Sequence, residues 1–212
     1  GLALKATTTI TQQPVSQSVS TGGTATFTIT ATGDGTLSYQ WQKNTVSLSN
    51  GGHYSGVTTA TLTISGTDQS DAASYRCVVT GGCGNATSNE AVLAVSPTIT
   101  QQPQPKITAT GGTVTFSVIA TGQGTLTYQW QKNSVNLSDG GHYSGVTTAT
   151  LTVSGADVND AGNYRCAVTN AAGTALSREA SLTISPSITQ HPLGRSICPG
   201  TTAAFTVTAI GQ

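Results

Sequence analysis

Short stretches of the chain alternate apolar and polar residues with a period of two. The clearest is 25–31, where Phe27 and Ile29 share one face and threonines occupy the other. Segments 61–64 and 75–79 follow the same pattern. Because successive side chains of a strand point to opposite faces, the pattern predicts half-buried β-strands. Gly-rich breaks separate these strands and no helical period is sustained, so the chain is predicted to be all-β and to form antiparallel β-sandwiches.

The same pattern occurs twice along the chain. Trp41 recurs as Trp130 and Cys77 as Cys166, each time after 89 residues. The string GGHYSGVTTATLT also appears in both copies, and a third copy begins near Ile188. Repeats of this length and similarity indicate a tandem array of domains, each of which folds as one unit.

The repeat also predicts where the domains begin and end. Two strands cannot bury a core alone, so the last segment should be marginal or borrow a partner from elsewhere. Because the predicted linkers are very short and contain proline, we expect a semi-rigid rod. The chain lacks Met, shows no signal peptide, and is expected to be a processed product or an internal piece of a longer array. The predicted segments are a leader or the last strand of a preceding domain (1–7), two complete domains (8–96 and 97–185), and the first two strands of an incomplete third domain (186–212).

Charge excludes some classes of partner. Charged residues make up 8% of the chain, and eight acidic residues balance eight basic ones. Such a chain has no electrostatic footprint for nucleic acid or an anionic membrane surface. It also has no run of 18 apolar residues, so no membrane insertion is expected within this segment.

A four-residue pattern recurs in both complete copies. An Asp precedes a Tyr by four residues, that Tyr precedes a Cys by two, and a Trp lies 36 residues before the Cys. This pattern resembles the D-x-G/A-x-Y-x-C motif and buried strand-C Trp of immunoglobulin-like domains, most closely the I-set type found in tandem in bacterial secreted proteins. The resemblance implies a tyrosine corner and a structural-core role for eight residues: Trp41, Asp71, Tyr75 and Cys77 in the first copy, and Trp130, Asp160, Tyr164 and Cys166 in the second.

One departure from the family pattern concerns its disulfide. The family places a second Cys on strand B, where this chain has Ile29 and Val118. Cys77 and Cys166 therefore lack the usual partner, and we expect each to be buried as a small hydrophobe against the Trp of its own domain.

Two further cysteines lie outside this pattern. Cys83 falls in a predicted turn, and Cys198 falls shortly before a predicted strand of the third copy. A whole domain separates them, which argues against an intrachain bond. Three states remain open for them: free thiols, bonds to parts of the array outside this sequence, or an interchain disulfide.

The residue types that could bind a metal have simpler roles in this sequence. His53 and His142 recur with no acidic cluster nearby in the sequence, so a surface or strand-edge role is expected for both. Two paired aspartates per copy offer too few oxygens for Ca²⁺ and are expected to cap a short helical turn. These pairs are Asp68/Asp71 and Asp157/Asp160. No metal or other cofactor is expected.

Catalytic and modification patterns are weak. No pair of carboxylates and no base beside a nucleophile is assembled by the sequence, so an enzyme is not expected. Asn85 and Asn136 match the N-glycosylation pattern, but chance matches are frequent in a chain rich in Asn, Ser and Thr.

The sequence leaves two functional hypotheses. The first is a structural spacer, stalk or filament segment of an extracellular multidomain repeat protein, whose partners are neighbouring domains of the array and other copies of the chain. The second is an adhesin-type module that binds carbohydrate or protein and is attached to a larger secreted protein or enzyme. The second would need exposed aromatic residues, and aromatics make up 5% of the chain. Both hypotheses place the chain outside the cell or on its surface.

Overall fold

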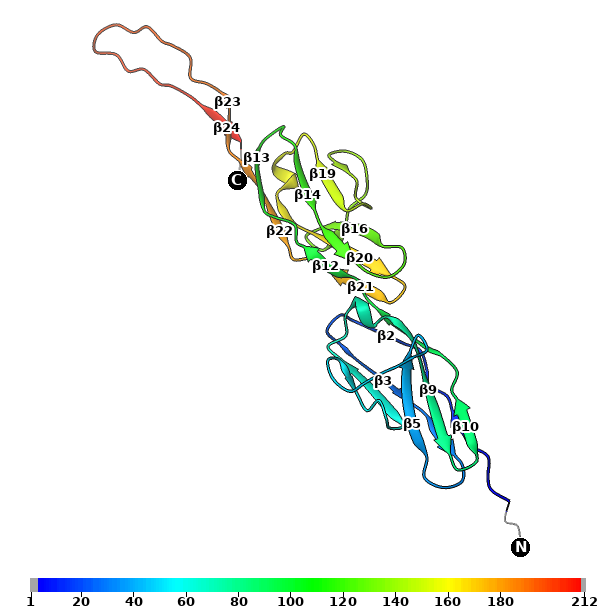
Figure 1. The fold of residues 1–212 in the computed structure, drawn as a ribbon. Helices are drawn as coiled ribbons and strands as arrows, with labels where there is room; N and C mark the ends of the chain where they lie inside the picture. Colours follow the sequence, from blue (N-terminus) through cyan, green and yellow to red (C-terminus); the bar gives the residue numbers. More distant parts are fainter. Residues whose placement is uncertain (1–3, 211–212) are drawn as a thin grey trace. The chain divides into compact units, whose positions relative to one another are not determined.

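The computed structural model describes residues 4–210, and the chain folds as two compact units (Figure 1). Strands β1 to β11 form the first repeat, and strands β12 to β22 form the second repeat. Residues 1–3 of the predicted leader or preceding strand lie outside the described residues, and residues 4–8 contain no strand. The prediction of an all-β fold of tandem sandwiches is confirmed.

The first repeat is built from two sheets. One has the order β2-β11-β9-β5-β6, with β10 paired to β9, and the other has the order β3-β8-β7. Strand β1 pairs with β4, which continues the line of β3. The bounds are β1 Thr9–Gln12, β2 Gln17–Val19, β3 Thr24–Thr28, β4 Thr30–Thr32, β5 Ser38–Lys43, β6 Val46–Ser47, β7 Tyr54–Ser55, β8 Thr61–Ser65, β9 Ala73–Gly81, β10 Gly84–Thr87 and β11 Ala91–Val95, with a 3₁₀ turn, η1, at Gln69–Asp71.

The second repeat has the same topology. Its sheets have the orders β13-β22-β20-β16-β17 and β14-β19-β18, β21 pairs with β20, and β12 pairs with β15. The bounds are β12 Thr98–Gln101, β13 Lys106–Ala109, β14 Val114–Ser117, β15 Ile119–Thr121, β16 Thr127–Lys132, β17 Val135–Asn136, β18 Tyr143–Ser144, β19 Thr150–Val153, β20 Gly162–Asn170, β21 Gly173–Leu176 and β22 Ala180–Ser185, with η2 at Val158–Asp160.

An aromatic stack lies at the centre of each core. In the first repeat Phe27 stacks on Tyr75 with ring centroids 5.2 Å apart, and its centroid lies 6.3 Å from that of Trp41. All three side chains are fully buried. Strand alternation brings them together, because β3 and β9 each bury every second residue. Aromatic contacts of this kind add roughly 0.5–1.5 kcal/mol each beyond the burial of their area.

The strand predicted over 25–31 is divided in two by the structure. Strand β3 pairs with β8, whereas β4 pairs with β1. Ile29 lies between them and donates its backbone N–H to the carbonyl of Ala60 at 3.0 Å. One continuous apolar–polar alternation thus spans two strands that pair with different partners. The periodicity of the sequence does not reveal this change of partner.

Beyond the second repeat, β23 (Ser187–Gln190) pairs antiparallel with β24 (Thr208–Ile210). The pairs Ser187↔Ile210 and Ile188↔Ala209 match the register that β1 makes with β4. Residues 191–207 between the two strands form no strand, as the long ribbon excursion in Figure 1 shows. We refer to residues 187–210 as the C-terminal hairpin.

Candidate functional site

The buried Asp71 gathers most of the polar contacts in the first repeat. Its Oδ1 accepts a hydrogen bond from the Tyr54 hydroxyl at 2.7 Å. Its Oδ2 lies 2.6 Å from Nδ1 of His53 and accepts the backbone N–H of Asp68 at 3.0 Å. The hydroxyl of Tyr75 donates to the backbone carbonyl of Asp71 at 2.7 Å. We call these five residues the His-Asp-Tyr cluster.

The second repeat reproduces the cluster around Asp160. Tyr143 donates to its Oδ1 at 2.7 Å, and Nδ1 of His142 lies 2.6 Å from its Oδ2. The backbone N–H of Asp157 donates to that same Oδ2 at 2.9 Å, and the hydroxyl of Tyr164 donates to the carbonyl of Asp160 at 2.6 Å. Two copies with one geometry show that the contacts follow from the repeated sequence.

Local structure explains how residues 18 positions apart meet. Strand β7 pairs with β8 with Tyr54 opposite Ile64, which turns His53 and Tyr54 back toward the end of β8. Turn η1 follows, with Asp68 as its N-cap accepting the N–H of Ser70 at 2.7 Å. Asp71 reciprocates by accepting the N–H of Asp68, which completes a capping box. The predicted helical turn is therefore confirmed as a 3₁₀ turn.

The hydrogen bonds control the ionisation of the central carboxyl. Burial favours the neutral acid, but donation from Tyr54, from the Asp68 backbone and from His53 more than compensates and lowers the pKa of Asp71 below its ordinary range. The pKa of Asp160 is lowered in the same way, against the opposing effect of burial. Both groups are therefore ionised carboxylates at neutral pH, and they act as strong hydrogen-bond acceptors.

The grouping corrects one expectation about the histidines. An acidic pair does lie beside each histidine. The possible ligand atoms of His53, Asp68 and Asp71 are within 4.8 Å of one another, and so are those of His142, Asp157 and Asp160. The Asp71 oxygens, however, already accept three hydrogen bonds, and Oδ1 of Asp68 accepts the N–H of Ser70. A Ca²⁺ ion needs six or more oxygens, far more than this set offers. Hydrogen bonding accounts for the arrangement without a metal.

The other residues of the sequence motif lie inside the cores. Trp41 is opposite Cys77 in the β5–β9 ladder, and both are fully buried. The indole N–H of Trp41 donates to the carbonyl of Thr59 at 2.9 Å, as that of Trp130 does to Thr148. Each buried tryptophan thus has its single donor satisfied, as a buried indole requires.

The four cysteines fall into two classes, and none is bonded to another within the chain. Cys77 and Cys166 are buried, and burial raises the pKa of each thiol to about 11. Such thiols carry almost no thiolate at neutral pH and are poor nucleophiles. Cys83 and Cys198 are exposed. The glycosylation-pattern residues Asn85 and Asn136, which the structure places on β10 and β17, are exposed as well.

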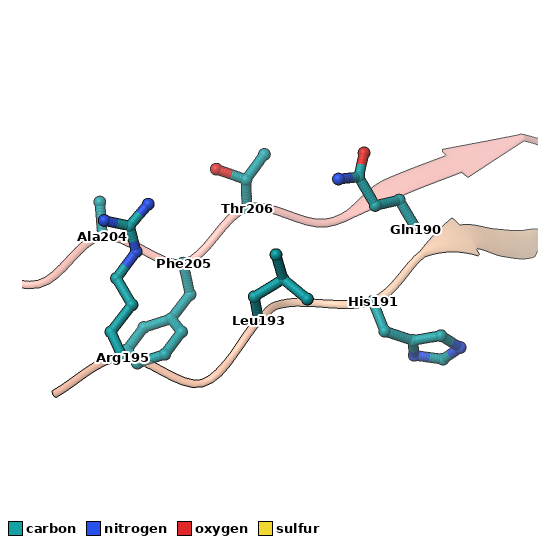
Figure 2. Close-up of a pocket in the computed structure, with 7 residues that line it drawn as sticks. All are labelled: Gln190, His191, Leu193, Arg195, Ala204, Phe205 and Thr206. Carbon is teal, nitrogen blue, oxygen red and sulfur yellow. The ribbon is translucent and has the colours of Figure 1, made fainter.

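A shallow pocket lies within the C-terminal hairpin (Figure 2). Figure 2 shows Phe205 on one arm reaching toward Arg195 on the other, with Leu193 between the arms. The remaining lining residues are Gln190, His191, Ala204 and Thr206. Phe205 is 64% exposed, so most of this aromatic side chain is open to solvent.

Two family models match the chain in tandem. A model described as Immunoglobulin I-set domain matches residues 8–95, and one described as Immunoglobulin domain matches residues 96–170. The chain belongs to the immunoglobulin domain family. The two immunoglobulin-like repeats share one sandwich topology. Each also contains the hydrogen bond from a buried tyrosine hydroxyl to the backbone carbonyl of the aspartate four residues before it.

Relatives of the immunoglobulin-like repeats are parts of much longer proteins. The chain is 32% identical to Endoglucanase C of Cellulomonas fimi over 82% of its length, 30% identical to Protein sax-3 of Caenorhabditis elegans over 71%, and 28% identical to mouse Hemicentin-1 over 90%. It spans only 16%, 12% and 3% of those three proteins, respectively. The similarity therefore concerns a module and not a whole protein.

Solved structures agree on the fold. Extracellular domains 3–5 of Drosophila OTK match with a TM-score of 0.60 at 23% identity, covering 84% of this chain and 62% of that one. The insect immune protein hemolin matches with a TM-score of 0.62 at 20% identity, covering 87% of this chain and 49% of that one. Within residues 4–210, no helix has the length and apolar character needed to cross a membrane.

Proposed function

We propose that this chain is a structural spacer or stalk segment of an extracellular or cell-surface multidomain repeat protein. The observation that carries the proposal is that each repeat pairs its polar groups and buries its aromatic side chains within itself. The His-Asp-Tyr cluster directs its hydrogen bonds into the fold, and no aromatic residue of either repeat is exposed. Binding surfaces usually present aromatic or Arg anchors, whereas these two repeats have no exposed aromatic residue and a single exposed Arg, Arg178.

The relatives support a modular role. One is a Cell adhesion molecule, DSCAML1 of mouse, 33% identical over 54% of this chain, and another is the Drosophila Tyrosine-protein phosphatase Lar, 30% identical over 82%. The chain spans 6% and 9% of these proteins. The presence of similar modules in proteins with such different names is best explained by a shared structural role.

A binding role remains the second candidate, because one specific observation favours it. The relative with 32% identity is named Endoglucanase C, so a similar module is part of an enzyme chain. In that setting the chain would be an adhesin-like or carbohydrate-binding appendage. Among the Phe, Trp and Tyr residues that the structure describes, Phe205 of the C-terminal hairpin is the one that is exposed, and it is the candidate anchor.

Cell-surface display tests the two candidates directly. The full chain is placed between a membrane anchor and an epitope tag, and antibody access to the tag is measured. A spacer should keep the tag accessible when the exposed Thr26 and the half-buried Thr63 are replaced by Ala, and should lose it when Trp41→Ala unfolds a repeat. Specific retention of the purified chain on a glycan array, abolished by Phe205→Ala, would overturn the spacer proposal in favour of the binding module.

A further inference from the structure

An Asn-Gly pair in the first repeat is chemically able to modify itself. Asn50 precedes Gly51 in the loop between β6 and β7, and both residues are exposed. The backbone nitrogen of a glycine can attack the side-chain amide carbon of a preceding asparagine, because the glycine has no Cβ to obstruct the approach. A cyclic succinimide forms and ammonia leaves, and water then opens the ring to aspartate or isoaspartate. The net reaction is hydrolysis of the side-chain amide, and water is its only co-reactant.

The fold opposes this reaction at both reacting groups. The nucleophile is the nitrogen of Gly51, whose N–H donates to the backbone carbonyl of Tyr54 at 2.9 Å, while the N–H of Tyr54 donates back to Gly51 at 3.0 Å. The electrophile is the side-chain amide of Asn50, whose Oδ1 accepts the N–H of Val57 at 3.2 Å. Val57 is only 2% exposed, so this bond ties the amide to a buried segment. Attack therefore requires that the loop first opens and breaks these hydrogen bonds.

The second repeat shows that the fold accommodates an aspartate at this position. Asp139 lies 89 residues after Asn50, and Gly140 follows it. Oδ1 of Asp139 accepts the N–H of Val146 at 3.1 Å, and Gly140 exchanges hydrogen bonds with Tyr143 at 2.9 and 3.0 Å. The φ of this glycine is 128°, the same as that of its counterpart in the first repeat. An aspartate thus makes the same loop contacts as the asparagine.

An isoaspartate does not fit the same loop. Its main chain runs through the side-chain carboxyl carbon, so one methylene group is inserted ahead of Gly51. The insertion displaces Gly51 relative to Tyr54 and separates their two reciprocal hydrogen bonds. The hydroxyl of Tyr54 donates to Asp71, and His53 contacts the same carboxylate. The longer main chain therefore also disturbs the His-Asp-Tyr cluster.

We propose that Asn50 is a site of spontaneous deamidation that the native fold suppresses and whose aspartate form the first repeat accepts. Conversion then takes place when the loop opens or the repeat unfolds. Each event adds one negative charge to a chain that carries no formal net charge at pH 7, so the modified form differs in its electrostatics from the original. The proposal does not depend on the spacer function.

Mass spectrometry measures the suppression. The full chain is incubated in mildly alkaline buffer with and without guanidinium chloride and is then digested with trypsin, and a zero-time sample corrects for conversion during digestion. The tryptic peptide 44–76 contains Asn50 and, as an internal control, Asn44, which precedes the β-branched Thr45. We expect conversion at Asn50 to be at least about tenfold slower in the native chain than in denaturant. Conversion at Asn44 should be slow in both conditions, because the Thr45 side chain obstructs the attack. Equal rates at Asn50 in the two conditions would overturn the proposal.

Stability measurements distinguish the two products. The variant Asn50→Asp supplies the aspartate form, and ion exchange of chain aged in denaturant and refolded supplies the isoaspartate form, identified by an isoaspartate-specific methyltransferase. We expect Asn50→Asp to unfold at the same denaturant midpoint as the parent chain, whereas the isoaspartate form should unfold at a lower midpoint. A clear fall in the midpoint of Asn50→Asp, or an isoaspartate form that unfolds like the parent chain, would contradict the proposal.

Discussion

Nδ1 of His53 lies 2.6 Å from Oδ2 of Asp71, and His142 makes the same contact with Asp160 at 2.6 Å. Each pair joins the start of the β7 or β18 strand to the 3₁₀ turn that precedes the longest strand of its repeat. Because the carboxylate also accepts the hydroxyl of the tyrosine next to the histidine, one ionised group holds the β7 or β18 segment to the 3₁₀ turn through two side-chain contacts.

Stability should fall with acid through these carboxylates. The folded-state pKa of Asp71 is lowered, so its stabilising contribution is present above the unfolded pKa of about 3.9 and is lost as pH falls through the folded value. We therefore expect the free energy of unfolding to decrease below about pH 4. Asp71→Asn combined with Asp160→Asn should lower it by about 2 kcal/mol per repeat at pH 7, because an amide cannot accept all these donors. Urea unfolding followed by tryptophan fluorescence from pH 2 to 7 measures both effects.

Asp139→Asn is the matched control for that series. Asp139 accepts the N–H of Val146 at 3.1 Å, and Asn50 accepts the N–H of Val57 at 3.2 Å in the same place of the first repeat. The substitution should therefore change stability by less than about 0.5 kcal/mol. An acid dependence that survives unchanged in the double variant would show that other groups cause it.

The sequence predicted the fold because its signals are local. Alternation around Phe27 and the recurring spacing of Trp41, Tyr75 and Cys77 are enough to indicate tandem immunoglobulin-like sandwiches. The contact of His53 with Asp71 was missed because it depends on how β7 returns along β8, which is tertiary information. One signal could have found it: the His-Tyr pair and the Asp recur with the same 18-residue separation in both copies.

The missing inter-sheet disulfide can be restored as a test of strand alignment. Ile29 is buried and holds the position where the family carries the partner of Cys77. Ile29→Cys should therefore form a disulfide with Cys77 and raise the free energy of unfolding by up to about 4 kcal/mol, since the bond closes a loop of nearly 50 residues. Unfolding is compared with and without reductant. If the variant remains a dithiol under oxidising conditions, Ile29 does not face Cys77.

Thiol reactivity should separate the cysteines into two pairs. Cys83 and Cys198 are exposed and should react with a thiol reagent in the native chain. Cys77 and Cys166 should react only after unfolding, because burial raises the pKa of each thiol to about 11. We expect two equivalents titrated in buffer and four in denaturant. A non-reducing gel of protein purified without reductant checks the interchain hypothesis: a monomer band alone would exclude it.

Backbone strain in the β5–β6 turn offers a stabilising substitution. Asn44 and Thr45 form its two-residue loop, with φ of 47° and 71°. Such turns need both residues in the left-handed region, which is costly for a β-branched side chain. Thr45→Gly should raise the free energy of unfolding by about 1 kcal/mol, and Ser134→Gly in the second repeat by less. Thr45→Ala, which keeps a Cβ, should gain little, and an equal gain from Ala would contradict the strain account.

The central claim is that each repeat is an autonomous, internally satisfied module of a spacer. Single-molecule force extension of the full chain tests it most directly. The account predicts two separate unfolding events, each lengthening the chain by roughly 300 Å, the extended length of about 90 residues less the folded span. Trp41→Ala should remove or weaken one event and leave the other unchanged, because each tryptophan is buried within its own repeat. A single event that releases both repeats together, or the loss of both events in this variant, would contradict the account.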